Sequence, residues 1–264
     1  MDITGNENNI AAQIDKYLPA IKKKYHINNN NQTAILCRGN TTIQLMDQAL
    51  TTAHKVFVET PLDRDNSEWG RLFREVIVSC FDPNIFAVDY AEQLFSENGE
   101  TKKYHKALEL CSKIFAADKN TIVSTSSEII KLAKLVYPQK ENSGAVNSLN
   151  QILRSDALLS SYVPASEDEI NLMTLHKSKG LEFNIVFHMD LYRWIFPNEY
   201  GDSDAQLQDL NLHYVGVTRA IDACYLMNGS MRYRKKTNDF ISSAPSPFLS
   251  LPGLAEKRKN VRWE

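Results

Sequence analysis

Five short apolar runs constrain the fold of this 264-residue chain more than any other feature. They read TAILC at 33–37, KVFVET at 55–60, INLMTL at 170–175, NIVFHM at 184–189 and ACYLM at 223–227. Each has the length of a strand and the apolar content of a buried one. Helical patterns lie between several of the runs, and strands that alternate with helices predict an α/β fold.

The helices that belong to this pattern are predicted from apolar residues at helical spacing. They cover about 8–25, 43–50 and 205–221. Pro19 lies inside the first of them, where a proline is expected to kink or end the helix. The predicted buried face of the last helix consists of Leu210, Tyr214, Val217 and Ile221.

Between residues 61 and 169 the strand patterns stop. Helical patterns there lie near 68–80, 84–97, 102–117, 126–136 and 145–160, separated by proline and glycine breaks such as Pro83, Asn98-Gly99 and Pro138. The order predicts one α/β domain formed by residues 1–60 and 170–264. An all-helical subdomain over 61–169 interrupts it.

The composition is that of an ordinary globular protein, with 43% hydrophobic and 23% charged residues. The four cysteines form no C-x-x-C pair, which favours a reduced protein without structural zinc. No apolar stretch approaches the roughly 18 residues that span a bilayer, and the polar N-terminus does not resemble a signal peptide. We therefore expect a cytoplasmic protein that contacts no membrane.

Charge is distributed unevenly along the chain, although the net charge is only −2. Residues 231–264 carry eight Lys and Arg against three acids, whereas the preceding residues carry 22 against 29. Such a basic tail can bind the phosphates of a nucleic acid. It can equally be a solvated terminus, and composition alone favours that simpler explanation.

The stretch NLMTLHKSKGLEF at 171–183 places charged residues directly after a predicted strand. A loop at the carboxyl end of a strand is where ligands bind in open α/β sheets. Gly180 would permit a positive φ or a close backbone approach. His176, Lys177 and Lys179 could meet phosphates, or the segment could be only a lysine-rich turn between two strands.

A second stretch, NLHYVGVTRAI at 211–221, carries Arg219 near the end of a predicted helix. Arg219 lies about 200° round that helix from Val217, away from the predicted buried face. An arginine there stabilises the helix dipole by about 0.3–1 kcal/mol, which explains it without any further function. The alternative is an arginine finger that meets the charge on a transferred phosphoryl group.

Together these segments resemble the superfamily 1 DNA helicases of the UvrD/PcrA/Rep type. INLMTLHKSKGLEFNIVF resembles the family's motif V with its following strand, and LHYVGVTRAID resembles motif VI, with IFP at 195–197 between them. TAILCRGNTTIQ, PLDR at 61–64 and APSPFLSLP at 244–252 resemble shorter flanking segments. TPLDR leading into LFREVI also resembles the compact UvrD-like helicases, such as the helicase subunit of Gabija-type anti-phage systems.

The resemblance implies the second RecA-like domain of an ATP-dependent, 3′-to-5′ DNA translocase, a parallel sheet flanked by helices. It implies that Arg219 is the finger on the γ-phosphate of ATP, which is bound with Mg²⁺. It further implies that Glu182 contacts the ribose of the nucleotide and that Gly180 shapes the loop. Tyr214 and Thr218 would support the motif VI helix.

The same resemblance implies contacts with single-stranded DNA. Thr174 and His176 would contact its backbone, together with Lys179. Base stacking requires exposed aromatic rings, and the candidates are Trp69, Tyr192 and Trp194. On the helical insertion, the resemblance to the compact helicases predicts a protein partner; a trimmed accessory domain without a special role is the alternative.

One departure from the family concerns the phosphate cradle. None of the ten glycines precedes a lysine, so the G-x-x-x-x-G-K-[ST] motif that holds the phosphates and Mg²⁺ is missing. We expect the cradle on an N-terminal RecA-like domain of the same helicase and no ATPase in this chain alone. Asp190 ends a run that resembles a metal-binding strand, but its place after motif V argues against a metal. The alternative function is a non-catalytic module that binds single-stranded nucleic acid or a protein.

Overall fold

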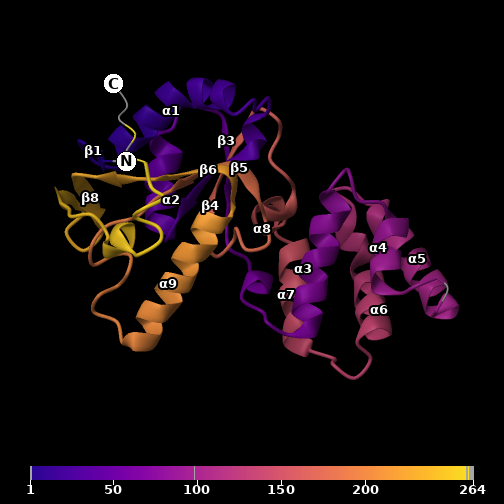
Figure 1. Cartoon of the computed structure of the whole chain (residues 1–264). Coiled ribbons are helices and arrows are strands. Elements are labelled where there is room, and N and C mark those ends of the chain that lie inside the picture. The colour runs from indigo at the N-terminus through magenta and orange to yellow at the C-terminus, as the bar shows by residue number, and fades with distance from the viewer. Residues whose placement is uncertain (1, 98, 260, 262–264) are drawn as a thin grey trace. The chain divides into compact units, whose positions relative to one another are not determined.

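The computed structural model describes residues 2–97, 99–259 and 261, and they form two compact units (Figure 1). The first unit combines Met1–Phe57 with Ala165–Glu264, and the second is Val58–Pro164. The sequence places these boundaries at 60 and 169, a few residues later in the chain. Asn98, in one of the predicted helix breaks, lies outside the described residues.

A five-stranded parallel sheet forms the centre of the first unit, in the order β3-β4-β2-β5-β6. The strands are β2 (Thr33–Cys37), β3 (His54–Phe57), β4 (Ile170–Thr174), β5 (Phe183–His188) and β6 (Ala220–Leu226). The predicted α/β fold is therefore confirmed. Every residue of β2 and β4 is buried, as in parallel strands that are covered on both faces.

Helices cover the two faces of this sheet. Ile35 and Cys37 of β2 pack in one apolar cluster with α1 (Glu7–Lys24) and α2 (Asn40–Ala49). Ala34 and Leu36 point the other way, because side chains alternate along a strand, and pack in a second cluster with α9 (Ser203–Thr218). Figure 1 shows α1 and α9 on opposite sides of the sheet.

The first helix continues through its proline. α1 runs on past Pro19 to Lys24, so the expectation that a helix could end at this residue is wrong. Leu18 and Ile21, on either side of the proline, are both buried in the cluster beneath α1. Tertiary packing of this apolar face outweighs the one backbone hydrogen bond that a proline removes.

The predicted buried face of α9 is wrong. Tyr214 is 68% exposed and Ile221 is 61% exposed, and Ile221 belongs to β6 rather than to the helix. The buried residues of α9 are instead Asp209, Leu212, His213 and Gly216. Hydropathy does not identify this face, because two of its members, Asp209 and His213, are polar residues buried inside the protein.

A β-hairpin near the C-terminus was not predicted. β8 (Met231–Arg234) and β9 (Asp239–Ser242) pair antiparallel, and β1 (Asp2–Ile3) pairs with β7 (Asn228–Gly229) in a separate two-stranded sheet. The hairpin strands are short, charged and largely exposed, so they lack the apolar pattern of a buried strand.

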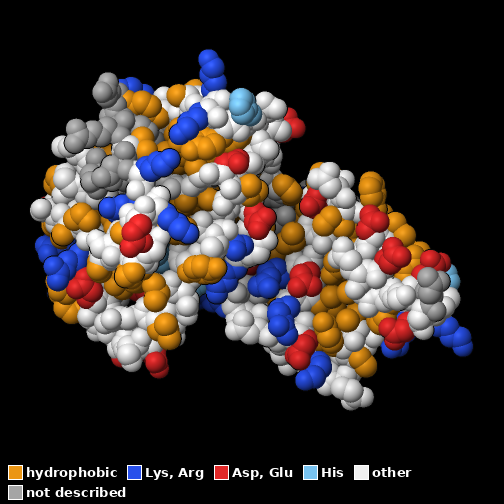
Figure 2. Space-filling view, in the orientation of Figure 1, with side chains coloured by type: hydrophobic (Ala, Val, Ile, Leu, Met, Phe, Trp, Pro, Cys, Tyr) orange, Lys and Arg blue, Asp and Glu red, His pale blue; other side chains and the backbone are white. Residues whose placement is uncertain are grey.

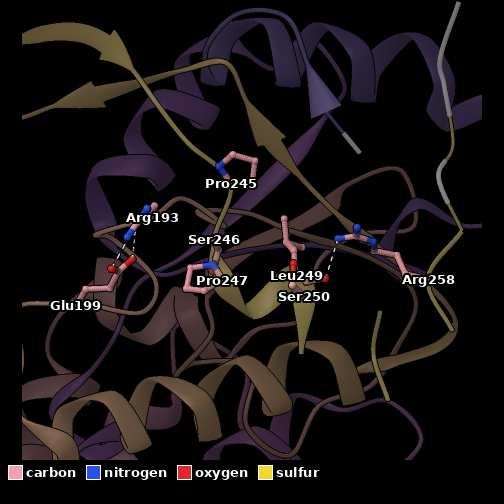
Figure 3. Close-up of a pocket in the computed structure, with 8 residues that line it drawn as sticks. All are labelled: Arg193, Glu199, Pro245, Ser246, Pro247, Leu249, Ser250 and Arg258. Atoms are coloured by element: carbon pink, nitrogen blue, oxygen red, sulfur yellow. Dashed lines mark hydrogen bonds and ion pairs between the residues drawn. The ribbon is translucent and has the colours of Figure 1, made fainter. Parts of the chain in front are cut away.

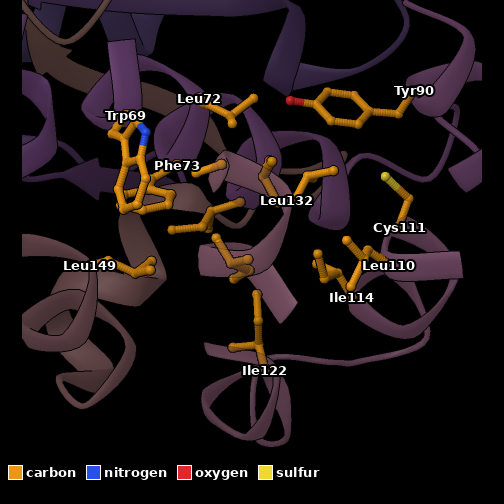
Figure 4. Close-up of a cluster of buried hydrophobic side chains, with 14 of the residues drawn as sticks. Trp69, Leu72, Phe73, Tyr90, Leu110, Cys111, Ile114, Ile122, Leu132 and Leu149 are labelled. Atoms are coloured by element: carbon orange, nitrogen blue, oxygen red, sulfur yellow. The ribbon is translucent and has the colours of Figure 1, made fainter. Parts of the chain in front are cut away.

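The second unit is helical, and no strand occurs among its described residues. Its helices are α3 (Glu68–Phe81), α4 (Ala87–Leu94), α5 (Thr101–Phe115), α6 (Ser126–Val136), α7 (Ser143–Leu153) and α8 (Asp156–Leu159). Ser155 caps α8, which divides the helix predicted over 145–160. The core of this unit contains Trp69, which is fully buried, so Trp69 is wrong as a stacking residue (Figure 4).

Within the described ranges, no helix has the length and apolar character needed to cross a membrane. The helices of the second unit present charged surfaces instead. Figure 2 shows acidic, basic and some hydrophobic side chains on the visible face of this unit. Several of the charges form ion pairs along one helix, such as Lys113 with Glu109 at 2.8 Å.

Candidate nucleotide and nucleic-acid site

The loop between β4 and β5, residues 175–182, follows the carboxyl end of a central strand of the sheet. Thr174, the last residue of β4, is buried, and its hydroxyl oxygen accepts a hydrogen bond from the backbone N–H of Lys177 at 3.1 Å. Ser178 N–H donates to the Thr174 carbonyl at 3.1 Å. Thr174 therefore holds the loop in a tight turn.

The remaining predicted residues of this loop lie at the surface. His176, Lys179 and Glu182 are exposed. Gly180 has φ +84°, which agrees with the positive φ that the sequence allows at this glycine. The loop therefore presents an imidazole, an ammonium group and a carboxylate at the carboxyl edge of the sheet.

Arg219 directly follows α9 and is bound to this loop. Its Nη1 donates to the carbonyl oxygen of Leu181 at 2.9 Å, and its Nε donates to the Val215 carbonyl at 3.3 Å. The backbone joins the same two segments, because Phe183 N–H donates to the Arg219 carbonyl at 2.8 Å. The structure thus binds the partly exposed guanidinium to Leu181, the residue before Glu182.

A close helix–strand contact positions α9, the helix that carries Arg219. A Cβ on Gly216 would lie 2.6 Å from Cδ2 of Leu175 and 2.8 Å from the His188 ring, distances that real Cβ atoms do not reach. A larger residue at this position would require the Leu175 and His188 side chains to shift. Gly216 therefore links the loop after β4 to the helix before Arg219.

Two buried histidines lie at this contact. His213 Nδ1 is 3.0 Å from His188 Nε2, and His188 Nδ1 is 3.1 Å from the carbonyl oxygen of Met189. Burial lowers the pKa of His188 to about 3, helped by the neighbouring His213, and burial lowers the pKa of His213 to about 4. Both rings are therefore neutral at neutral pH.

Asp190 binds the residues at the start of α2. Its carboxylate accepts hydrogen bonds from the backbone N–H of Arg38 at 2.7 Å and from the Thr42 hydroxyl at 2.6 Å. Arg38 precedes Gly39, the N-cap of α2, and Thr42 lies in the first turn, so Asp190 anchors both sides of this helix start. Burial raises the pKa of the Asp190 carboxyl, and these donors oppose the rise. No potential metal cluster occurs among the residues that the structure describes.

Arg38 and Asp209 connect two loops at the same edge. Arg38 Nη2 forms an ion pair with Asp209 Oδ1 at 3.0 Å. The second oxygen of Asp209 accepts from the backbone N–H of Asn198 at 2.8 Å. A residue of α9 thereby ties the loop after β2 to the loop after β5.

A cavity of about 380 Å³ lies beside Asp190 and the start of α2. Its lining includes Arg38 and three cations of the β8–β9 hairpin, Arg232, Arg234 and Lys235. The basic C-terminal segment noted in the sequence is therefore partly folded against α1 and the start of α2 rather than wholly a solvated tail. Arg262 of that segment lies outside the described residues.

The sequence patterns did not single out His188, Asp209 and His213, and they did not indicate that Asp190 is buried and binds the start of α2. The one available signal was their position, because Asp209, His213 and Gly216 recur at i, i+4 and i+7 along α9. Tyr192, a predicted stacking residue, is also buried, and its hydroxyl oxygen accepts from Gly229 N–H at 3.2 Å. Tyr192 is therefore wrong as a surface platform.

These features define an α/β domain of the class that holds ligands at the carboxyl edge of a parallel sheet. The UvrD-like helicase C-terminal domain family matches residues 85–229, which is more than half of the chain. The chain belongs to this family, and the resemblance seen in the sequence is confirmed.

Relatives with curated names support the same assignment. The chain is 40% identical over 101 residues to the ATP-dependent DNA helicase PcrA of Bacillus subtilis, covering 35% of the chain and 13% of PcrA. It is 36% identical over 119 residues to PcrA of Leuconostoc citreum, covering 42% and 15%. It is 27% identical over 199 residues to the ATP-dependent DNA helicase Rep of Escherichia coli, covering 75% and 27%. The chain thus spans less than a third of these relatives.

Proposed function

We propose that this chain is the second motor domain of a UvrD-like, ATP-dependent DNA helicase or translocase. The observation that carries the proposal is the hydrogen bond from the Arg219 guanidinium to the Leu181 carbonyl, directly beside Glu182. It joins the two segments that resemble motifs V and VI at one edge of the sheet.

For the nucleotide, Arg219 would serve as the finger on the γ-phosphate of ATP, bound with Mg²⁺. Its hydrogen bonds to two neutral carbonyls orient the guanidinium. A phosphate oxygen is a stronger acceptor than a carbonyl because it is charged, so it would replace them as the partner. Glu182 would contact the ribose, and Gly180 would keep the loop close to it. The P-loop would come from an N-terminal RecA-like domain of the same helicase.

The exposed face of α9 supports such a partner domain. Leu207, Leu210 and Tyr214 recur at i, i+3 and i+7, and all three are exposed. This stripe leads along the helix toward Arg219. We expect the N-terminal domain to cover it when the nucleotide site closes.

For single-stranded DNA, His176 and Lys179 would contact the backbone, and Thr174 would act by holding their loop. The cavity beside Asp190 is lined by four cations and by the carboxylates of Glu7 and Asp190, and this excess of positive charge supports a polyanionic ligand near this edge. A protein partner on the helical unit would contact its exposed apolar side chains, such as Phe86, Val88 and Val123.

A phosphate-release assay tests the proposal. With ATP, Mg²⁺ and single-stranded DNA, the chain alone should release phosphate only at background rate. Turnover that Arg219→Ala abolishes would contradict this, since it would place a complete site on the chain.

In a second version of this assay, the chain is joined to an N-terminal motor domain that carries a P-loop. DNA-stimulated phosphate release should then appear, and Arg219→Ala should lower kcat by about 1,000-fold or more. Arg154→Ala, an exposed arginine of the helical unit, is the matched control and should change little. DNA binding without any such turnover would favour the non-catalytic module instead.

A further inference from the structure

A cavity of about 550 Å³ lies in the first unit between two loop segments (Figure 3). The loop after β5 supplies Arg193 and Glu199, and the segment that follows β9 supplies the remaining lining residues. This volume falls within the roughly 300–1,000 Å³ of ligand pockets. In the described part of the chain, no residue of the loop after β4 or of α9 lines it, so it is distinct from the candidate nucleotide site.

Backbone hydrogen bonds hold the two segments together. Arg193 N–H donates to the Ala244 carbonyl at 2.8 Å, and Ser246 N–H donates to the Leu191 carbonyl at 2.8 Å. The buried hydroxyl of Ser246 donates to the carbonyl of Phe196. The walls of the cavity are therefore fixed by the fold, and a ligand would not have to order them.

Two arginines lie on opposite sides of the cavity, and Figure 3 shows Arg193 on one side and Arg258 on the other. The Arg258 Nη1 donates to the Leu249 carbonyl at 3.0 Å. Its Nε and Nη2 have no hydrogen-bond partner among the described residues. Residues 256–259 carry three cations against one acid, and all four are exposed. The Arg258 side of the cavity therefore attracts an anionic group such as a carboxylate.

Glu199 supplies an acceptor on the Arg193 side. Its Oε2 accepts from Arg193 Nε at 3.4 Å. Its Oε1 is buried and accepts no hydrogen bond, although the same Nε lies 3.3 Å away. A buried acceptor without a donor is costly, so a ligand that donates to it is favoured. A DNA backbone has no such donor and is repelled by the carboxylate, whereas a peptide backbone offers an N–H at every residue except proline.

The wall between the two charged sides is largely apolar. Pro245 and Pro247 are exposed on it, next to the largely buried Leu249. The prolines have no N–H, so this wall does not offer the backbone donors of a strand edge. It offers apolar surface for a side chain instead.

We propose that this cavity binds a short acidic peptide segment of a protein partner. A carboxylate of the peptide would pair with Arg258, one backbone N–H would donate to Glu199, and an apolar side chain would pack against the prolines. Only a ligand that combines anions, donors and an apolar group satisfies all three parts of the lining. The inference goes beyond the proposed function and does not depend on it, because peptide binding requires neither nucleotide nor DNA.

Fluorescence anisotropy with three labelled peptides tests the proposal. The probe repeats the sequence Asp-Glu-Leu-Glu-Asp, a second peptide has serine in place of each leucine, and a third has the amide in place of each acid. The proteins are the unaltered chain, Arg258→Gln, Ser250→Trp and Arg234→Gln. Ser250 is an exposed lining residue, so a tryptophan there would fill the cavity without removing a charge.

Arg234→Gln is the matched control, because it removes an exposed arginine of the same unit that lines the other cavity. Circular dichroism and thermal unfolding verify that each variant is folded. The unaltered chain should bind the probe about tenfold more tightly than either of the other peptides. Arg258→Gln should weaken binding of the probe about tenfold, because a charge-assisted hydrogen bond is lost.

Ser250→Trp should weaken binding of the probe at least as much, whereas Arg234→Gln should leave it unchanged. Absence of probe binding by the unaltered chain would overturn the proposal. Equal losses in Arg258→Gln and Arg234→Gln would also overturn it, because binding would then reflect only the general positive charge of the unit.

Binding of an oligothymidylate distinguishes a peptide site from a nucleic-acid site. Arg258→Gln should bind the oligothymidylate as tightly as the unaltered chain does. A loss for the oligothymidylate as large as the loss for the probe would indicate an unselective anion site and would overturn the peptide proposal.

Discussion

His213 and His188 form a hydrogen bond between their ring nitrogens at 3.0 Å, which joins α9 to β5 inside the protein. The carbonyl of Met189 can only accept, so His188 Nδ1 carries its proton and His188 Nε2 accepts from His213 Nδ1–H. The neutral tautomers of both rings follow from this chain of contacts. His213 Nε2 is then an acceptor, and it is buried with no hydrogen-bond partner.

The pair should make stability depend on pH. The folded pKa values of about 3 and about 4 lie below the ordinary value of 6.5, so the unfolded chain binds more protons as the pH falls below 6.5. The stabilisation is complete above this value and is lost toward acid. From pH 7 to pH 5, the free energy of unfolding should fall by about 2 kcal/mol per histidine.

Urea unfolding at several pH values measures this dependence. His213→Asn, which retains a donor for His188, should show a flatter profile than the unaltered chain. Burial raises the pKa of Asp190 and of Glu7, which acts in the opposite direction, but those residues are common to both proteins. Identical profiles would show that His213 is not held neutral.

Gly216→Ala should destabilise the first unit. The added methyl group would overlap the side chains of Leu175 and His188, and both of these side chains are fully buried, with little room to shift. We expect a loss of about 1–3 kcal/mol, the usual cost of overpacking. Chemical denaturation measures it, with Gly39→Ala as the control, because a Cβ there meets nothing within 4 Å. Equal effects at the two glycines would contradict the close approach.

Asp190→Ala should loosen the start of α2. The substitution leaves the backbone N–H of Arg38 and the Thr42 hydroxyl without their acceptor, and we expect a loss of about 1–3 kcal/mol. Asp190→Asn should cost less, because it keeps one oxygen and tolerates the φ of +63°. The exposed Asp222→Ala is the control in thermal unfolding. A stability that depends on added Mg²⁺ would instead indicate a metal ligand.

Lys179→Ala should change how DNA binding responds to salt. Each lysine that contacts a phosphate adds about one to the slope of log Kobs against log salt concentration, so this slope should become shallower by about one. Lys113→Ala, on the helical unit, should leave it unchanged. Fluorescence anisotropy with an oligothymidylate at several salt concentrations measures both slopes, and equal slopes would exclude a phosphate contact at Lys179.

Much of the first unit was predictable because its elements have strong local patterns. The strand at 33–37 has the predicted bounds, and the strands at 170–174 and 183–188 lie within one residue of them. Buried parallel strands are continuous apolar runs, and this pattern needs no knowledge of their partners. The hairpin at 231–242 could not be predicted, because its short charged strands lack the apolar pattern of a buried strand.

For the candidate site, the sequence indicated which residues belong to it. It did not indicate which contacts position these residues. The motif resemblance singled out Arg219 and Glu182, and the structure brings the two segments together through Leu181. It could not show that Thr174 is buried within its turn. Nor could it show that Trp194 is exposed, whereas Tyr192 and Trp69 are buried.

The sequence by itself determined the order of the five sheet strands and of the helices between them, the family, and the glycine that the loop after β4 requires. These depend on local periodicity, on backbone preferences and on long matching segments. Only the tertiary structure decided which face of α9 meets the sheet and what Asp190 and the two histidines do. Their roles depend on partners distant in the chain, because a polar side chain is stable in the interior only where a second group satisfies it.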